Sequence, residues 1–431
     1  MPRQEPGFSE AILAILGLCT ISIALPLFNT LAGGISFFIA HKASATDIVL
    51  FALIIFLIPA IVCCIALGLV RVVHTGLGRL FLYFILAVLV GLWIAGLLRQ
   101  LTSIEVLAIV IVGAAATVFG LSRYPQFLSF LRMLGLISPL VPLGFLFLSP
   151  VNGLLRDEKP LESNQKQIST TPVVMVVLDE LSLVSMLDSN GNVDSGRLPN
   201  FGRLAQLSTW YSNTTTVSGL TDRAVPALLS GLKVSGGTAP LYRQFPQNLF
   251  TVLAPSHRVS AVETITRLCP PSVCTTDTSH DAKTAQEQVA EPVQMYNDAT
   301  IVYLHTLLPE SLAAAYLPEI SGRWRGFRNS RDVTTDASTK APQKLSHVGD
   351  MVRNRALRFK KFSQQAAHIE HHSARYFHLA LPHYPWLHLP DGTIYNGSEI
   401  PGRSKTEFAW ETDQYLVEQG QWRYAMQVEY L

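Results

Sequence analysis

Residues 1–150 consist of long apolar stretches separated by short polar segments. A helix needs about 20 apolar residues to cross the hydrocarbon core of a bilayer. Five stretches in succession reach about that length with few charges inside them, which disfavours a signal peptide followed by buried core helices. The pattern therefore predicts a transmembrane region with five spans, at 9–28, 48–70, 80–98, 103–121 and 128–149. A transporter is a weaker interpretation, because no span carries a clear ionisable pair.

An odd number of spans places the two ends of the chain on opposite sides of the membrane. Short cytoplasmic loops are enriched in lysine and arginine. The side that holds the N-terminus carries more of them: Arg3, Arg71, Arg79 and Arg123, against Lys42 and Arg99. We therefore expect a multi-pass protein of the cell membrane with a cytoplasmic N-terminus and an extracytoplasmic C-terminal domain.

The pattern changes after a polar linker at 151–171. Apolar, β-branched runs then alternate with amphipathic ones, which predicts an α/β domain over 172–431 with a mostly parallel sheet. The first run is apolar throughout and is typical of a strand buried on both faces. The predicted strands are Val173–Leu178, Trp210–Thr216, Arg258–Thr264 and Arg375–Leu381, and the predicted helices are Pro199–Leu207, Asp222–Ser230 and Gln343–His372. Residues 275–342 have no clear pattern and are interpreted as an insertion.

Composition narrows the choice of partners. The formal net charge is only +2, and no basic run with interleaved aromatic residues occurs, so nucleic acid is not an expected partner. Three of the five cysteines lie in the apolar spans. The other two, Cys269 and Cys274, form a close pair in a domain expected to be exported, which favours a disulfide. The alternative is half of a zinc site, but it lacks a second ligand pair.

Chemically useful side chains follow two of the predicted strands. Asp179 and Glu180 come directly after the first strand, and His383 follows the last one. Ligands of open α/β sheets bind at the carboxyl ends of the strands. Two adjacent carboxylates there suit a hard divalent cation. For Asp179 taken alone, capping of the next helix is the simpler interpretation.

A Ser/Thr-rich loop leads into the predicted helix at 222–230. Thr221 stands at or beside the helix N-cap, where free N–H groups and the helix dipole favour an anion. A hydroxyl there, with Arg223 close behind, suits attack on a phosphate or sulfate ester. The alternative is that Thr221 only caps the helix.

Three segments together resemble the alkaline phosphatase superfamily. Val173–Glu180 is similar to its first metal-binding strand, Thr221–Gly231 to its nucleophile helix, and Phe377–Trp386 to a strand and His-x-Pro segment that contacts the ester. Within that superfamily the chain resembles the sulfatase-like branch with an N-terminal membrane region. That branch includes membrane-anchored sulfatases, lipoteichoic acid synthases and phosphoethanolamine transferases.

The resemblance implies a site and a substrate class. Asp179, Glu180 and Thr221 would hold a divalent metal ion (Ca, Mn, Mg or Zn), Thr221 would be the nucleophile, and Arg223 and His383 would contact the ester oxygens. Threonine cannot be converted to the formylglycine that sulfatases use, so phosphoryl chemistry on a lipid headgroup or cell-envelope glycan is favoured. A sulfuric ester hydrolase remains the alternative.

The chain also departs from the family pattern. The family's remaining metal ligands lie in an Asp-His-Gly segment, and no Asp-His dipeptide occurs here. The sequence stops at Leu431 within a predicted helix, which is where the family leads towards that segment. We therefore expect a truncated, incomplete domain that is inactive as it stands. A non-catalytic membrane protein that binds a partner or polysaccharide is the other interpretation.

Overall fold

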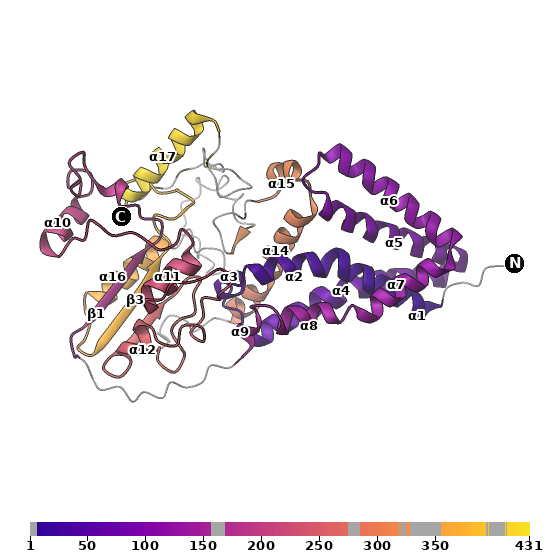
Figure 1. The fold of residues 1–431 in the computed structure, drawn as a ribbon, viewed down its shortest axis with the longest axis horizontal. Coiled ribbons are helices and arrows are strands. Elements are labelled where there is room, and N and C mark those ends of the chain that lie inside the picture. The colour runs from indigo at the N-terminus through magenta and orange to yellow at the C-terminus, as the bar shows by residue number, and fades with distance from the viewer. Residues whose placement is uncertain are drawn as a thin grey trace. The chain divides into compact units, whose positions relative to one another are not determined.

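The computed structural model describes residues 7–156, 169–274, 285–318, 320, 325–327, 355–393, 395, 410 and 412–431. The chain forms two compact units, shown in Figure 1. The membrane unit comprises Met1–Phe38, Lys42–Asp157 and Met295–Pro318. The sheet unit comprises Ile39–His41, Glu158–Gln294 and Glu319–Leu431.

The membrane unit is helical. Its helices are α1 (Phe8–Cys19), a π-helical turn η1 (Thr20–Ala24), α2 (Leu25–Gly33), α4 (Ala45–Val73), α5 (Thr75–Leu97), α6 (Ser103–Arg123), α7 (Pro125–Ile137), α8 (Leu140–Phe147), α9 (Asn152–Leu155) and α15 (Glu310–Tyr316). Two helices, α3 (Ser36–Ala40) and α14 (Ala285–Leu307), are divided between the two units at Phe38 and at Met295. Among the described residues, five helical runs are long and apolar enough to cross a membrane: Phe8–Gly33, Ala45–Val73, Gly76–Leu97, Ser103–Arg123 and Gln126–Phe147. The five predicted stretches are confirmed as such helices, with ends that differ by a few residues.

Two of these helices begin with reciprocal caps. The hydroxyl of Ser44 accepts from the amide of Asp47, whose carboxylate accepts from the amide of Ser44. Thr102 and Glu105 repeat the arrangement at the start of α6. Such capping boxes satisfy helix N–H groups that have no partner within the helix. Glu105 therefore serves as the capping carboxylate at the start of α6.

The sheet unit contains a parallel sheet formed by β1 (Val173–Leu178), β2 (Arg258–Val262) and β3 (Ser373–Leu379). Within the described residues the strand order is β1-β3-β2. The register pairs Val177 with His378. The unit's helices are η2 (Val184–Met186), α10 (Pro199–Leu207), α11 (Thr221–Ser230), α12 (Leu249–Leu253), α16 (Arg355–Ala366) and α17 (Gln414–Glu429).

Helices cover both faces of this sheet. Side chains alternate between the two faces of a strand, so each strand contributes to a core on either side. One face forms a core with α11 and α12, made of Met175, Val177, Val225, Leu229, Phe250, Ala374 and Tyr376. The opposite face forms a core with α16, made of Phe359, Phe362, Phe377 and Leu379. Parallel strands and helices on both faces agree with the α/β class expected for this part of the chain.

The expected strand at Trp210–Thr216 is absent: the described backbone there is turn and irregular structure. Its threonine hydroxyls bond to nearby carbonyls instead, from Thr214 to Tyr211 and from Thr216 to Ser218. Such local bonds offer the backbone an alternative to a strand ladder.

The expectation that β1 is buried on both faces is also wrong. Val174 and Val176 are 45% and 38% exposed. Both side chains point to the face that α16 covers, but β1 is an edge strand of the described sheet and the α16 core is built on β3. An apolar run alone does not distinguish a central strand from an edge strand with one open face.

The long helix expected at Gln343–His372 ends earlier. α16 closes at Ala366, and His372 has a φ of +57°, which a right-handed helix does not contain. Residues 343–354 lie outside the described part of the chain. The last two strands keep their predicted places, with β2 ending at Val262 and β3 covering Ser373–Leu379.

Candidate functional site

Asp179 stands at the carboxyl end of β1. Its amide donates to the carbonyl of Leu379 at 3.0 Å, so the strand ladder continues to this residue. Val177 pairs with His378, and Asp179 lies two residues further on, so Asp179 and His378 are diagonal neighbours on one face of the sheet. The Nε2 atom of His378 lies 3.4 Å from Oδ2 of Asp179, and the imidazole is fully buried.

Thr221 is the first residue of α11, and its side chain points to Asp179. Its hydroxyl donates to Oδ1 at 3.2 Å and to Oδ2 at 3.3 Å. Leu220 is the N-cap, and no side chain caps this helix. Within the described residues, the amides of Thr221 and Asp222 have no hydrogen-bond acceptor, whereas those of the next two residues bond to the Leu220 carbonyl. Thr221 therefore presents a hydroxyl beside two open N–H groups and does not act as the cap.

The surroundings of Asp179 favour its ionised form. Burial alone raises the pKa of this carboxyl group. The imidazole of His378 beside the carboxylate, the nearby imidazole of His383 and the hydrogen bond from Thr221 act in the other direction and together hold the pKa of Asp179 below its ordinary value. Asp179 is therefore a carboxylate at neutral pH, suited to accept hydrogen bonds or to bind a cation.

Glu180 follows directly but faces another group. Its backbone has a φ of +63°, in the left-handed region, so the chain turns sharply after Asp179. Its Oε2 accepts from the amide of Tyr384 at 2.9 Å, and its Oε1 lies 3.4 Å from Nε2 of His383. The Glu180 carboxylate thus holds the segment that contains His383.

His383 is buried, 5% exposed, within this segment. Its Nδ1 donates to the Tyr384 carbonyl at 2.6 Å, because a carbonyl oxygen can only accept. The other nitrogen faces Glu180. The structure therefore places His383 beside the acidic pair, with its ring orientation fixed from both sides.

Two further buried side chains hold the same segment from behind. Arg355 of α16 donates to the carbonyls of Ala380, His383 and Pro385 at 2.6–2.9 Å. The amide of Gln427 from α17 donates to the carbonyl of Pro382 at 2.8 Å, and its oxygen accepts from Arg355 at 2.9 Å. These bonds satisfy polar backbone that buried loops otherwise leave unpaired.

Arg223 lies one position beyond the two open amides. Residues two apart point to different sides of a helix, so it does not share the side of Thr221. Its guanidinium lies along the loop at Gly236, where an added Cβ atom would lie 3.3 Å from Nη2. Within the described residues Arg223 forms no ion pair.

Cys269 and Cys274 form a disulfide with a Cα–Cα distance of 6.0 Å. The turn beside it is tied to β2 through Glu263, whose carboxylate accepts from the amides of Leu268 and Cys269 and from the hydroxyl of Thr266. Burial raises the pKa of Glu263 despite these bonds. The bridge therefore closes the loop that follows β2.

The geometry allows a partial test of the expected metal site. Two oxygens at right angles on one cation lie about 3.0–3.4 Å apart for metal–oxygen distances of about 2.1–2.4 Å. The separations between Thr221 and Asp179, 3.2 and 3.3 Å, match this edge. Among the described residues, however, no group of three or more His, Cys, Asp or Glu side chains is arranged to hold an ion. The same separations are those of the hydrogen bonds described above, so the metal site stays a prediction.

His378 is the side chain that sequence reasoning missed. It lies inside the segment compared with the ester-binding strand, but only His383 was selected there. A histidine within an otherwise apolar strand is the available signal, because such a strand buries its side chains. The parallel register that brings His378 to Asp179 cannot be read from either segment alone.

Comparisons with known proteins add no relative: no family model, no curated protein and no solved structure matches this chain. A functional assignment therefore depends on the side chains described above.

Proposed function

We propose that this chain is a membrane-anchored enzyme-like protein whose sheet unit is extracytoplasmic and acts on phosphate esters, with Thr221 as the nucleophile. The observation that carries the proposal is the hydroxyl of Thr221, which stands at the start of an uncapped helix and donates to the partly buried carboxylate of Asp179. The resemblance of three segments to the sulfatase-like branch of the alkaline phosphatase superfamily supports the same chemistry. An alkaline-phosphatase-like fold is part of the proposal.

In this mechanism Asp179 orients the Thr221 oxygen for attack on phosphorus. The Thr221 O–P bond forms while the ester O–P bond breaks. The proton released by the Thr221 hydroxyl passes to solvent, and solvent protonates the departing alcohol. Water or an acceptor alcohol then releases the phosphoryl group from Thr221. Because an ionised Asp179 with a lowered pKa is a weak base, it serves mainly to position the hydroxyl.

The remaining residues have matching roles. The open amides of Thr221 and Asp222 can donate to the ester oxygens, as helix N-termini do for anions. The resemblance assigns Arg223 to the same oxygens, although its guanidinium lies at Gly236 and would have to turn towards Thr221. His378 keeps the Asp179 carboxylate in place. A divalent cation (Ca²⁺, Mn²⁺, Mg²⁺ or Zn²⁺), held by Asp179 and Thr221, would supply positive charge that favours the alkoxide form of the threonine. Glu180 would hold His383 towards the ester.

One observation favours a second candidate, a non-catalytic membrane protein that binds an ester or partner. Among the described residues no group of three or more His, Cys, Asp or Glu side chains could hold an ion, whereas a hard cation prefers six or more oxygens or waters. In that case the site would bind a phosphate group without turnover. A sulfuric ester hydrolase remains the catalytic alternative.

The test uses the full chain in detergent with Mn²⁺, a bis-aryl phosphodiester and an aryl sulfate. Release of the phenol from the phosphodiester would overturn the inactivity expected from the absent Asp-His-Gly segment. Any such release should fall at least 100-fold in Thr221→Ala and less in Thr221→Ser, which keeps a hydroxyl. The control is Thr215→Ala, an exposed threonine of the preceding loop. Peptide mass mapping that finds an aryl phosphoryl group on Thr221 would locate the intermediate.

Three results decide between the candidates. Equal turnover by wild type and Thr221→Ala removes Thr221 as the nucleophile. Turnover of the sulfate alone favours the hydrolase of sulfuric esters. Phosphate binding that depends on Thr221, without turnover of either ester, favours the non-catalytic protein.

A further inference from the structure

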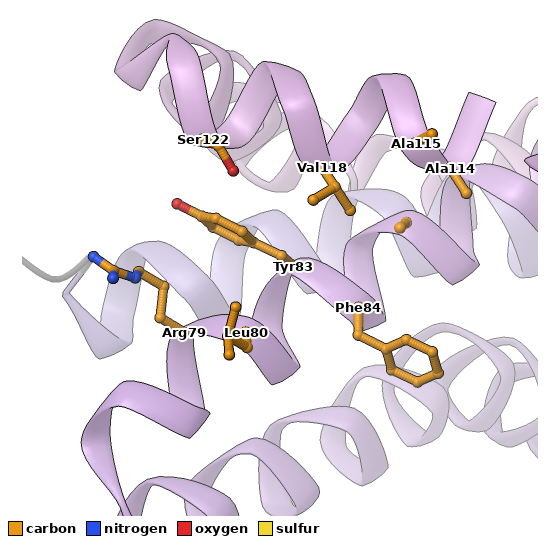
Figure 2. A pocket seen from close by; sticks show the side chains of 9 residues that line it. Arg79, Leu80, Tyr83, Phe84, Ala114, Ala115, Val118 and Ser122 are labelled. Atoms are coloured by element: carbon orange, nitrogen blue, oxygen red, sulfur yellow. The ribbon is translucent and has the colours of Figure 1, made fainter. Parts of the chain in front are cut away.

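A groove lies between α5 and α6 of the membrane unit, as shown in Figure 2. Its volume is about 470 Å³. Small-molecule sites in proteins typically measure about 300–1,000 Å³. The groove is therefore large enough to be a ligand site and is separate from the residues discussed above.

The packing of the two helices explains why there is space. At Gly91 an added Cβ atom would lie 3.1 Å from Val110 Cγ1, and at Gly113 it would clash with Ile94 Cδ1. The helices approach closely at that level, as small residues permit in membranes. Closer to the start of α5 the facing residues include Ala87, Ala114 and Ala115, which are too small to fill the gap.

The groove is polar at one end and apolar at the other. Arg79, Tyr83 and Ser122 gather at one end in Figure 2, and Ala114 and Ala115 lie towards the other. The hydroxyl of Tyr83 donates to the carbonyl of Leu121 at 3.2 Å, in the last turn of α6. Arg79 forms no ion pair within the described part of the chain. A cation without a protein counter-charge thus stands at the polar end.

The rim of the groove consists of large apolar side chains. Leu80 and Phe84 are 63% and 60% exposed, and Val118 is 39% exposed. These residues belong to helices that are apolar enough to cross a membrane, so their exposed faces suit contact with acyl chains. The groove is accordingly accessible from the lipid phase.

We propose that this groove binds one membrane phospholipid, with an acyl chain along its apolar floor and the phosphate at Arg79. A guanidinium can pair with phosphate through two parallel hydrogen bonds. Arg79 lies near the start of α5, and helix ends are where lipid headgroups are found. Ser122 adds a hydroxyl at the same end. The inference uses the membrane unit alone and does not depend on the proposed function of the sheet unit.

The experiment is native mass spectrometry of the full chain in detergent with dioleoyl phosphatidylglycerol. Dioleoylglycerol, which has the same chains without a phosphate, is the comparison probe. We expect one tightly retained phosphatidylglycerol and about tenfold weaker binding in Arg79→Ala, the loss that one charge-assisted contact represents. Arg123→Ala is the matched control. Arg123 follows Ser122 at the end of α6, and its guanidinium lies over the Tyr124 ring.

The apolar part is tested with Ala114→Leu, which fills the floor, against Ala116→Leu, an exposed neighbour outside the groove. Only the first should displace the lipid. Photolabelling of the wild type with a lipid whose acyl chain carries a diazirine locates the chain without any substitution. The label is expected on α5 and α6 at the groove. Equal losses in Arg79→Ala and Arg123→Ala, equal binding of dioleoylglycerol, or labels only on other helices would overturn the proposal.

Discussion

Asp179 directly follows β1, and its side chain contacts two other elements. It accepts a hydrogen bond from Thr221 of α11 and lies against His378 of β3. Its lowered pKa means that the folded state binds the proton less tightly than the unfolded chain does. The stabilisation from its ionised form is therefore complete above the unfolded pKa, about 3.9, and is lost as the pH falls through the lower folded value.

Asp179→Asn should therefore lower the stability of the metal-free protein in a pH-dependent way. We expect a loss of about 1–3 kcal/mol in the free energy of unfolding at pH 7, from the lost charge-assisted bonds. The difference from wild type should shrink below about pH 4 as Asp179 of the wild type becomes protonated. Denaturant unfolding of the full chain in detergent with a chelator measures it. Asp222→Asn is the control at the same helix start, and a gap unchanged down to pH 3 would contradict the assignment.

At this scale the sequence predicted the components better than their contacts. A carboxylate after an apolar strand and a threonine before a helix were sufficient to select Asp179 and Thr221, and the structure brings them together. The direction of Glu180 was not predictable, because it depends on a left-handed backbone at that residue. Arg355 and Gln427 carried no signal, since their role depends on carbonyls that only the folded loop presents.

Among the elements, those with a single strong pattern were predicted most closely. β1 matches its predicted range, and α11 ends at Ser230 before Gly231, whose φ of +70° suits the residue after a helix. The Trp210–Thr216 segment failed because β-branched threonines favour a strand only when a neighbouring strand pairs with them. Periodicity describes one element and does not report its neighbours.

Two helices of the membrane unit approach each other closely at a pair of glycines. α1 and α7 meet at Gly17 and Gly135: an added Cβ at Gly17 would lie 2.6 Å from the Gly135 amide nitrogen, and one at Gly135 would clash with the Leu13 carbonyl. Gly135→Ala should therefore push the helices apart, with a loss of about 1–3 kcal/mol from overpacking. Gly144→Ala in α8 meets nothing within 4 Å and should be neutral or slightly stabilising.

The melting temperatures of the two glycine variants in detergent, followed by circular dichroism, check this expectation. Only Gly135→Ala should melt well below wild type. Equal melting of both variants would show that α1 and α7 do not approach as closely as described.

For the whole molecule, the division into units does not follow chain order. Met295–Pro318, which follows much of the sheet unit in sequence, belongs to the membrane unit. There Tyr303 donates to the carbonyl of Ser22 at 3.0 Å, and the Tyr296 ring stacks on Phe51 at 5.5 Å. Sequence patterning could not predict this, because such contacts join residues more than 200 positions apart.

Five spans and the distribution of arginines lead to the last prediction. If all five apolar helices cross the membrane, the α4–α5 and α6–α7 connections share a side with the N-terminus, and the sheet unit lies opposite. Single cysteines introduced as Lys361→Cys in α16 and Gln100→Cys after α5 should react with a membrane-impermeant maleimide in intact cells. Tyr124→Cys, in the α6–α7 connection, should react only after permeabilisation, because loops rich in arginine remain in the cytoplasm.

The wild-type chain is the control for background labelling, since its cysteines lie in the spans or in the disulfide. The reverse labelling pattern would place the sheet unit in the cytoplasm and remove the extracytoplasmic part of the proposed function. Labelling of Lys361→Cys without that of Gln100→Cys would instead mean that α5 and α6 do not both cross the bilayer.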